Sequence, residues 1–465
     1  MASESTRPHM PDLVIHKILL FLPTKSAVRL SFLSKQWEGV WCSAPILDFD
    51  EGGDENGNNN LSQHRRFVEN ILSRYLKFIV EEEKEKQGLQ KVKLHMTRYL
   101  TGDASIVTKL LSSSFERGVK ELDISLRVSE TQWDHGGNDI ENYNNLSTMQ
   151  LIKAKSAAPM KNYYYFSRNA LANAKSLTTL NFGYVRITNI SSKEYSTSTC
   201  LLPSLKSMSL KTVHFDSETL LYLMHECPSI EYLSINSCCL GDDLKVSSSS
   251  LKSLQVEHCD CFAIRVDNAV NLESLAIISD IGPPQLPNFE SIILKDCSNL
   301  KRMNICAPQL KLFSLDGCLD VKGTVDAPLL QSFTFKGYLS SKFSVKAPNL
   351  AWSRIVLFDN WGREAAATFN SRPWNHFTTL SNFLKEFGSS RSLDLYVTHI
   401  KALMFPKDFR ETLSSPIFPS LENFYFSVKN PFKKRNKELS DSLNWMAPDA
   451  QVIEHRPWRM RQGPF

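Results

Sequence analysis

Residues 305–350 read ICAPQLKLFSLDGCLDVKGTVDAPLLQSFTFKGYLSSKFSVKAPNL, and the fold can be read outward from this stretch. The pair Ala-Pro occurs in it three times at a spacing of 20 residues, at Ala307-Pro308, Ala327-Pro328 and Ala347-Pro348. A β-branched residue lies two positions before each alanine, and a leucine lies three positions after it. One pattern that returns at a fixed spacing indicates an internal repeat, which determines the fold of a whole region.

The leucines begin the frame apolar-x-x-apolar-x-apolar, as in Leu310, Phe313 and Leu315. Frames that start at 230, 251, 272, 289, 310, 330 and 350 are separated by 21, 21, 17, 21, 20 and 20 residues. This length is typical of leucine-rich repeats. The last two apolar positions alternate as on a short strand with one buried face. Because one such strand cannot bury that face alone, we expect the repeats to stack into a solenoid with a curved parallel sheet.

Weaker frames begin at 89, 119, 177 and 205, and late strands are expected near Leu393 and Leu421. Four cysteines lie eight residues after the start of their frames, at Cys238, Cys259, Cys297 and Cys318. This is the Asn/Cys position of the leucine-rich repeat, so we expect small buried side chains where the chain leaves the strand. A zinc site built from Cys238-Cys239 and Cys259-x-Cys261 lacks the paired C-x-x-C spacing.

The first 50 residues follow a helical pattern instead. Apolar residues from Leu13 to Leu22 recur at helical spacing, and Pro23 stops that segment. A second amphipathic segment runs from Ala27 to Trp41. Two or three short helices make a very small core, which gains stability when a partner covers its remaining apolar surface.

The stretch PDLVIHKILLFLPTKSAVRLSFLSKQW, residues 11–37, resembles an F-box. Together with the irregular leucine-rich repeats and their recurrent Ala-Pro, the chain resembles the plant family of F-box/LRR proteins. The expected fold class is α/β, with a small N-terminal helical F-box module followed by an irregular leucine-rich-repeat solenoid. The resemblance implies a non-catalytic substrate receptor of an SCF-type ubiquitin ligase, in which a Skp-type adaptor links the chain to a cullin and a RING subunit. The adaptor contacts that it implies are Pro11, Leu13, Ile15, Ile18, Leu19, Leu22, Pro23, Val28, Leu30, Leu33 and Trp37.

The expected organisation has four parts. An F-box at 8–50 is followed at 51–88 by an acidic, Asn-rich loop and a connecting helix that covers the first edge of the solenoid. The solenoid spans 89–430, with a long polar insertion near 128–160. Residues 431–465 form a basic and polar tail or cap.

Solenoids usually recognise partners through the strand-lined face. The outward positions of the frame are therefore candidates for binding an unidentified target protein, although an ordinary solvated sheet face explains the same residues. The candidates are Tyr232, Asn236, Gln255, Glu257, Ser314 and Thr334.

Composition excludes several functions. The 54 Lys and Arg residues against 49 Asp and Glu leave a net charge of +5, too small to indicate nucleic acid or an anionic membrane. The sequence has no signal-peptide pattern and no transmembrane segment, so we expect a cytoplasmic or nuclear protein. Motifs for phosphate binding, zinc hydrolysis or a nucleophilic serine are absent, and no metal or cofactor is expected. The alternative to a ligase receptor is an LRR interaction scaffold that takes no part in ubiquitination.

Overall fold

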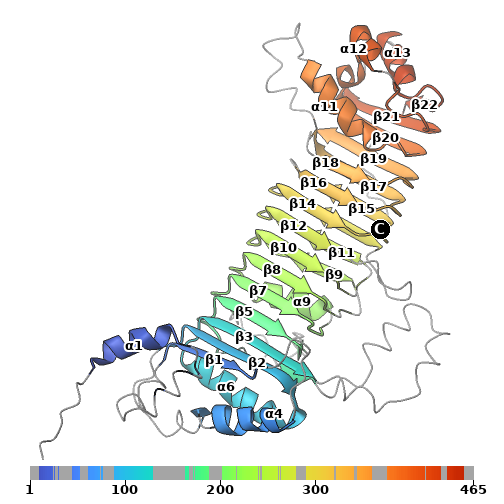
Figure 1. Ribbon diagram of the computed structural model, residues 1–465. Helices are drawn as coiled ribbons and strands as arrows, with labels where there is room; N and C mark the ends of the chain where they lie inside the picture. Colours follow the sequence, from blue (N-terminus) through green and yellow to red (C-terminus); the bar gives the residue numbers. More distant parts are fainter. Residues whose placement is uncertain are drawn as a thin grey trace, which may run out of the picture. The chain divides into compact units, whose positions relative to one another are not determined.

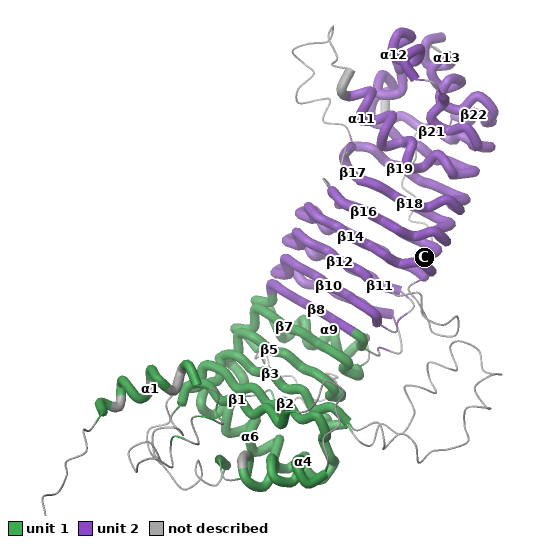
Figure 2. The backbone as a smooth tube through the Cα atoms, in the orientation of Figure 1, with its two compact units in different colours: residues 1–230, 237–239 green, residues 231–236, 240–465 purple. Residues whose placement is uncertain are grey.

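The computed structural model describes most of the chain. The described residues are 10–22, 24, 26, 30, 44–52, 61–73, 75–76, 88–128, 163–166, 171, 173–187, 202–215, 217–238, 240, 243–259, 261, 263–278, 290–318, 321–339, 343–358, 374–413, 415–430 and 437–454. They form two compact units, residues 1–230 with 237–239, and residues 231–236 with 240–465 (Figure 2). The long insertion expected near 128–160 lies almost entirely outside the described residues.

The first unit is built on a parallel sheet with helices between its strands (Figure 1). Its strands lie in the order β1 (Ile46–Asp50), β2 (Lys91–Tyr99), β3 (Glu121–Val128), β5 (Thr179–Gly183) and β7 (Ser207–Lys211). A separate pair joins β4 (Tyr164–Phe166) to β6 (Val185–Ile187). Its helices are α1 (Asp12–Leu20), α4 (Leu61–Phe67) continued by the π-helical turn η2 (Val68–Leu72), the 3-10 turn η3 (Thr101–Asp103), α6 (Ala104–Glu116) and α9 (Ser217–His225).

The second unit contains strands from two parallel sheets. The first sheet runs through β8 (Tyr232–Asn236), β10 (Ser253–Glu257), β12 (Ser274–Ile278), β14 (Arg302–Cys306), β16 (Lys322–Asp326) and β18 (Phe343–Lys346). The second runs through β9 (Leu244–Ser247), β11 (Ala263–Asp267), β13 (Ser291–Lys295), β15 (Leu312–Asp316), β17 (Ser332–Tyr338), β19 (Trp352–Phe358), β20 (Ser392–His399), β21 (Asn423–Asn430) and β22 (Gln451–Glu454).

After β19 the first sheet has ended and helices alternate with the strands of the second sheet. They are α11 (Trp374–Lys385), the 3-10 turn η9 (Ile400–Leu403), α12 (Lys407–Thr412) and α13 (Lys437–Met446). The segment expected to be a tail or cap thus contains α13 and β22, and β22 pairs in parallel with β21.

The α/β fold class and the long parallel sheets are confirmed. The last two apolar positions of each frame point into the core, as Leu233 with Ile235, and Phe333 with Phe335, show. The expectation of a single sheet is wrong for the second unit, because from β8 to β19 successive strands alternate between the two sheets, and only the second sheet continues through β20, β21 and β22. The 17-residue step between the frames at 272 and 289 marks the place where the frame passes from β12 in the first sheet to β13 in the second.

The corners between strands are built in the same way repeatedly. The residue directly after a strand takes a left-handed backbone conformation, with φ between 51° and 56°, at Tyr184, Thr212, Ser237, His258, Asn268 and Asp296. Cys238, Cys259 and Cys297 each follow one of these residues, whereas Cys318 follows Gly317, whose φ is 77°. All four predicted cysteines are buried. The Cys238 thiol donates to the Leu210 carbonyl at 3.3 Å, and the Cys259 thiol to the Ile235 carbonyl at 3.5 Å. The predicted role of these cysteines in the core is therefore confirmed.

Each Ala-Pro pair makes the turn between a strand of the first sheet and the next strand of the second. The Leu310 N–H donates to the Ala307 carbonyl at 3.0 Å, and the Leu330 N–H donates to the Ala327 carbonyl at the same distance. Proline fits the second position of such a turn, because its fixed φ is already correct and it has no N–H to satisfy. The alanine N–H groups of 307 and 327 donate to the next repeat, at Asp326 and Lys346.

Candidate interaction surfaces

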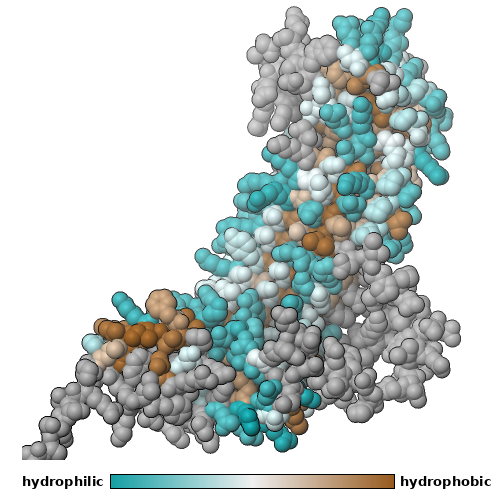
Figure 3. All heavy atoms as spheres, in the orientation of Figure 1, coloured by the Kyte–Doolittle hydropathy of each residue, from teal (hydrophilic) through white to brown (hydrophobic). Residues whose placement is uncertain are grey.

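Helix α1 presents an apolar surface to solvent. The side chain of Leu13 is 80% exposed and that of Phe21, directly after the helix, is 86% exposed, with Met10 and Val14 also exposed. Figure 3 shows a strongly hydrophobic patch over α1. Single exposed apolar side chains are ordinary, but a contiguous group on one short helix indicates a surface that a partner covers.

The structure divides the predicted adaptor contacts. Ile15 is fully buried and belongs to the core. Leu13 and Pro11 are exposed, while Ile18, Leu22 and Leu30 are half-buried. Leu19 lies in α1, but its side chain is outside the described residues, as are Pro23, Val28, Leu33 and Trp37. The exposed residues Val14 and Phe21 are not among the contacts predicted from the sequence. Phe21 could have been found, because it lies outside the helical spacing of the apolar core positions and close to the expected helix end.

Thr24 connects the helical segment to the sheet. Its side chain is buried, and its hydroxyl oxygen accepts the backbone N–H of Asp48 in β1 at 2.5 Å. Because this bond joins the segment after α1 to the first strand, α1 is attached to the first unit by more than the covalent chain.

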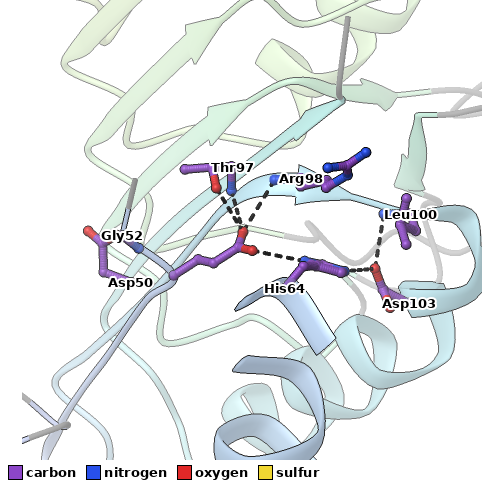
Figure 4. A network of polar contacts seen from close by, with 8 residues as sticks. Asp50, Gly52, His64, Thr97, Arg98, Leu100 and Asp103 are labelled. Carbon is purple, nitrogen blue, oxygen red and sulfur yellow. Dashed lines mark hydrogen bonds and ion pairs between the residues drawn. The ribbon is translucent and has the colours of Figure 1, made fainter. Parts of the chain in front are cut away.

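A buried ionic cluster of Glu51, His64 and Asp103 lies next to β2 (Figure 4). His64 Nδ1 lies 3.0 Å from Glu51 Oε1, and His64 Nε2 lies 2.9 Å from Asp103 Oδ2. The other oxygen of Glu51 accepts the backbone N–H groups of Thr97 at 2.7 Å and Arg98 at 3.2 Å. The side chains of His64 and Glu51 are 2% and 0% exposed, so this cluster joins the end of β1, α4, β2 and η3 away from solvent.

The cluster holds His64 in its charged form. Burial alone would lower the pKa of His64, but the hydrogen bonds and negative charges of Asp103 and Glu51 outweigh burial and raise that pKa to about 9. Burial alone would likewise raise the pKa of Glu51, yet His64 and the N–H of Thr97 hold it below its usual value. A protonated imidazole donates from both ring nitrogens, which matches its two carboxylate neighbours.

The predicted target residues fall on two different sheets. Tyr232 and Asn236 lie on β8 and Gln255 and Glu257 on the adjacent β10, whereas Ser314 and Thr334 lie on β15 and β17 of the other sheet. They therefore do not form the single face that the sequence frame suggested. Tyr232 is half-exposed, and Glu257 accepts hydrogen bonds from Asn236 at 2.7 Å and Gln255 at 2.6 Å.

In the part of the chain that the structure describes, no three or more His, Cys, Asp or Glu side chains are grouped so that they could hold a metal ion. No described helix is long and apolar enough to cross a membrane.

Two segments match known protein families. Residues 8–49 match the F-box domain. Residues 144–288 match the family described as "FBD-associated F-box protein At5g56370, LRR repeats". The first match contains α1, and the second contains strands from β4 to β12. The resemblance to plant F-box/LRR proteins is therefore confirmed from two separate parts of the chain.

Relatives from Arabidopsis thaliana carry the same names. The chain is 28% identical over 229 residues to the "Putative FBD-associated F-box protein At5g56690", covering 49% of this chain and 46% of the relative. It is 33% identical over 129 residues to the "FBD-associated F-box protein At5g22730", covering 28% and 25%. The "F-box/FBD/LRR-repeat protein At2g04230" is 22% identical over 347 residues, 67% of each chain. The chain thus spans half or less of the length of the first two relatives.

Proposed function

We propose that this chain, which carries the F-box and the leucine-rich repeats of plant F-box/LRR-repeat proteins, is the substrate-recognition subunit of an SCF-type E3 ubiquitin ligase. In this role the F-box binds a Skp-type adaptor, which connects the chain to a cullin and a RING subunit. The repeats bind the protein that is to be ubiquitinated. The chain itself performs no catalysis, and the proposal places it in the cytoplasm or the nucleus.

One observation supports this function most directly: the exposed apolar surface of α1 lies inside the segment that matches the F-box domain. A soluble protein gains stability when such side chains are removed from water, at roughly 25 cal/mol per Å² of apolar surface. Leu13 and Phe21 are therefore the side chains that we expect to enter the adaptor interface, whereas Ile15 is buried and belongs to the core.

The test is a binding measurement between the full chain and a purified Skp-type adaptor. We expect Leu13→Asp and Phe21→Asp each to weaken binding by about 30-fold, the effect of losing an interface side chain worth about 2 kcal/mol. Both side chains point to solvent, so the substitutions should leave the fold intact.

Leu221→Asp is the matched control, because Leu221 is an exposed leucine on another helix, α9. We expect this variant to bind the adaptor like the unmodified chain. Adaptor binding that is unchanged by Leu13→Asp and Phe21→Asp, or absent from the unmodified chain, would contradict the proposal and favour an interaction scaffold outside ubiquitination.

A further inference from the structure

The outward face of the late strands in the second sheet differs from that of the earlier ones. In β17, β19 and β20 every second residue is buried and the residues between are partly exposed. Strand register aligns Tyr338 with Phe358, and Val356 with Tyr396, so these side chains share one face. We call the outward residues Tyr338, Trp352, Arg354, Phe358 and Tyr396 the aromatic face.

The earlier strands of the second unit have no comparable face. Among the described outward positions of β8 to β16, Tyr232 is the only aromatic residue, and Ser, Thr, Asn, Lys and Asp are common there. Four aromatic residues with an arginine on three strands therefore represent a local change of surface chemistry. Trp, Tyr and Arg are the residue types enriched among the side chains that contribute most to protein binding.

The contacts within the aromatic face show that its charges are already compensated. The Arg354 guanidinium lies over the Trp352 ring, 5.0 Å from the ring centroid, and its Nε donates to Asp394 Oδ2 at 3.0 Å. Beside it, Lys336 pairs with Asp316 at 2.6 Å. The rings of Tyr338 and Phe358 meet edge to face with centroids 6.1 Å apart. An occupant therefore meets rings and paired charges and finds no net charge to neutralise.

The paired charges of the aromatic face favour a binding partner that is itself uncharged. A charged segment would lose its hydration against the aromatic face without gaining an opposite charge, and burying an uncompensated charge is costly. An uncharged apolar segment would instead cover ring surface that is now in contact with water.

We propose that the aromatic face is the surface on which the repeats bind their target, and that the bound part of the target is an apolar segment without net charge. This inference rests on the proposed function, since it names the recognition surface of that receptor. The proposed target site is therefore centred on the aromatic face instead of on Ser314 and Thr334, which lie on the same sheet. Tyr232 and Gln255 lie on the other sheet and are not part of the proposed site.

The experiment uses the full chain bound to its Skp-type adaptor, panned against a displayed library of random peptides. We expect enriched peptides that are apolar and have no net charge. Trp352→Ser and Phe358→Ser should each weaken binding of a selected peptide by about 30-fold, as for an aromatic residue at the centre of an interface. Tyr232→Ser, the matched control on β8, should change the affinity by less than 2-fold, roughly the effect of a peripheral contact.

A conservative variant tests the charge argument even where a serine variant fails to fold. Asp394→Asn removes the partner of Arg354 and leaves one positive charge on the aromatic face. A second selection with this variant should then enrich acidic peptides. Selection of charged peptides by the unmodified chain, unchanged selection with Asp394→Asn, no enrichment at all, or equal losses with Tyr232→Ser would each overturn the inference. Because adaptor binding is assigned to α1 and peptide binding to the aromatic face, an unmodified chain that binds the adaptor but enriches no peptide counts against this surface and leaves the ligase proposal standing.

Discussion

Two helical segments attach to parallel sheets in different ways, one in each unit. In the first unit, α4 is joined to β2 and η3 by the buried charges of Glu51, His64 and Asp103. In the second unit, α11 and the turn after it pack through aromatic rings. Phe383 in α11 lies against Phe335 with ring centroids 5.2 Å apart, and Phe387 in the turn lies against Phe333 at 4.9 Å. Attachment by ions depends on protonation and attachment by rings does not, so the two units should respond differently to the same change of conditions.

A carboxylate also takes part in the second attachment, but it has a different role. Glu386, directly after α11, accepts the backbone N–H of Val345 at 2.7 Å and the Ser344 hydroxyl at 2.9 Å. Both donors lie on β18, the last strand of the first sheet. An unpaired edge strand is a site for unwanted pairing with other chains, and a side chain that occupies its donors reduces that risk.

Removing a ring from the second attachment should have the largest effect. Phe383 is buried and contacts Phe335, Phe343 and Phe387, so Phe383→Ala should destabilise the unit by about 3–5 kcal/mol. Hydrogen exchange followed in peptides from β17 and β18 would measure the loss. Phe383→Leu fills most of the space and should cost less. Equal exchange in the alanine variant and the unmodified chain would show that α11 does not hold these strands.

Removing the histidine from the first attachment should cost about 3 kcal/mol, the lower end of the range for a buried ion pair that loses one partner. His64→Leu leaves Glu51 and Asp103 without their shared cation, and exchange in peptides from β2 should increase. The control is His95→Leu, because His95 also lies 3.0 Å from a carboxylate, Asp123, but is about one-third exposed. If His64→Leu and His95→Leu increase hydrogen exchange in β2 equally, the buried cluster contributes no more to stability than a partly exposed ion pair does.

The pH dependence separates the two attachments more finely. The pKa of His64 is raised to about 9 in the folded protein, above the 6.5 expected when the chain is unfolded. Its contribution to stability is therefore complete below pH 6.5 and is lost as the pH rises through about 9. Protection of β2 against exchange, corrected for intrinsic rates, should fall over this interval relative to His64→Leu. Protection of β17 should not differ between the two proteins, and a parallel change there would indicate a general effect of pH.

The smallest effect is expected at the edge strand. Glu386→Ala removes the acceptor of two partly buried donors and should cost about 1–2 kcal/mol in the protection of β18. Glu386→Gln retains an oxygen for the Val345 N–H and should lose less. An alanine variant that is as stable as the unmodified chain but aggregates at lower concentration would show that Glu386 prevents pairing of β18 with other chains without stabilising the fold.

The sequence predicts one strand of each repeat well, for a physical reason. An inward frame of three apolar residues is long enough to stand out, whereas the second strands show only short pairs such as Leu244 with Val246. The 17-residue step between the frames can be seen in the sequence. Only the strand pairing shows that the frame lies on the first sheet before this step and on the second sheet after it. In α1 six of the nine residues are apolar, so contacts with the rest of the unit decide that Ile15 is buried and Leu13 exposed.

The ionic cluster had no signal in the sequence. Glu51 and His64 are 13 residues apart and His64 and Asp103 are 39 apart, and each residue type is common on protein surfaces. Only the packing of α4 against β2 and η3 makes them neighbours. The aromatic face differs, because Trp352 and Phe358 stand out in the sequence as late aromatic residues that could anchor a target. Only the strand register places them on one face with Tyr338 and Tyr396.

The Ala-Pro turns have a consequence for how such a chain can change length during evolution. From Ala307 to Ala327 and on to Ala347, each turn occupies the same place between the two sheets, one repeat further along. A recombination event between two such turns removes or adds one complete repeat and leaves every remaining strand in its original register. Neighbouring genes that exchange DNA at these points can therefore produce repeat proteins of different lengths in single steps, with turns that already fit one another.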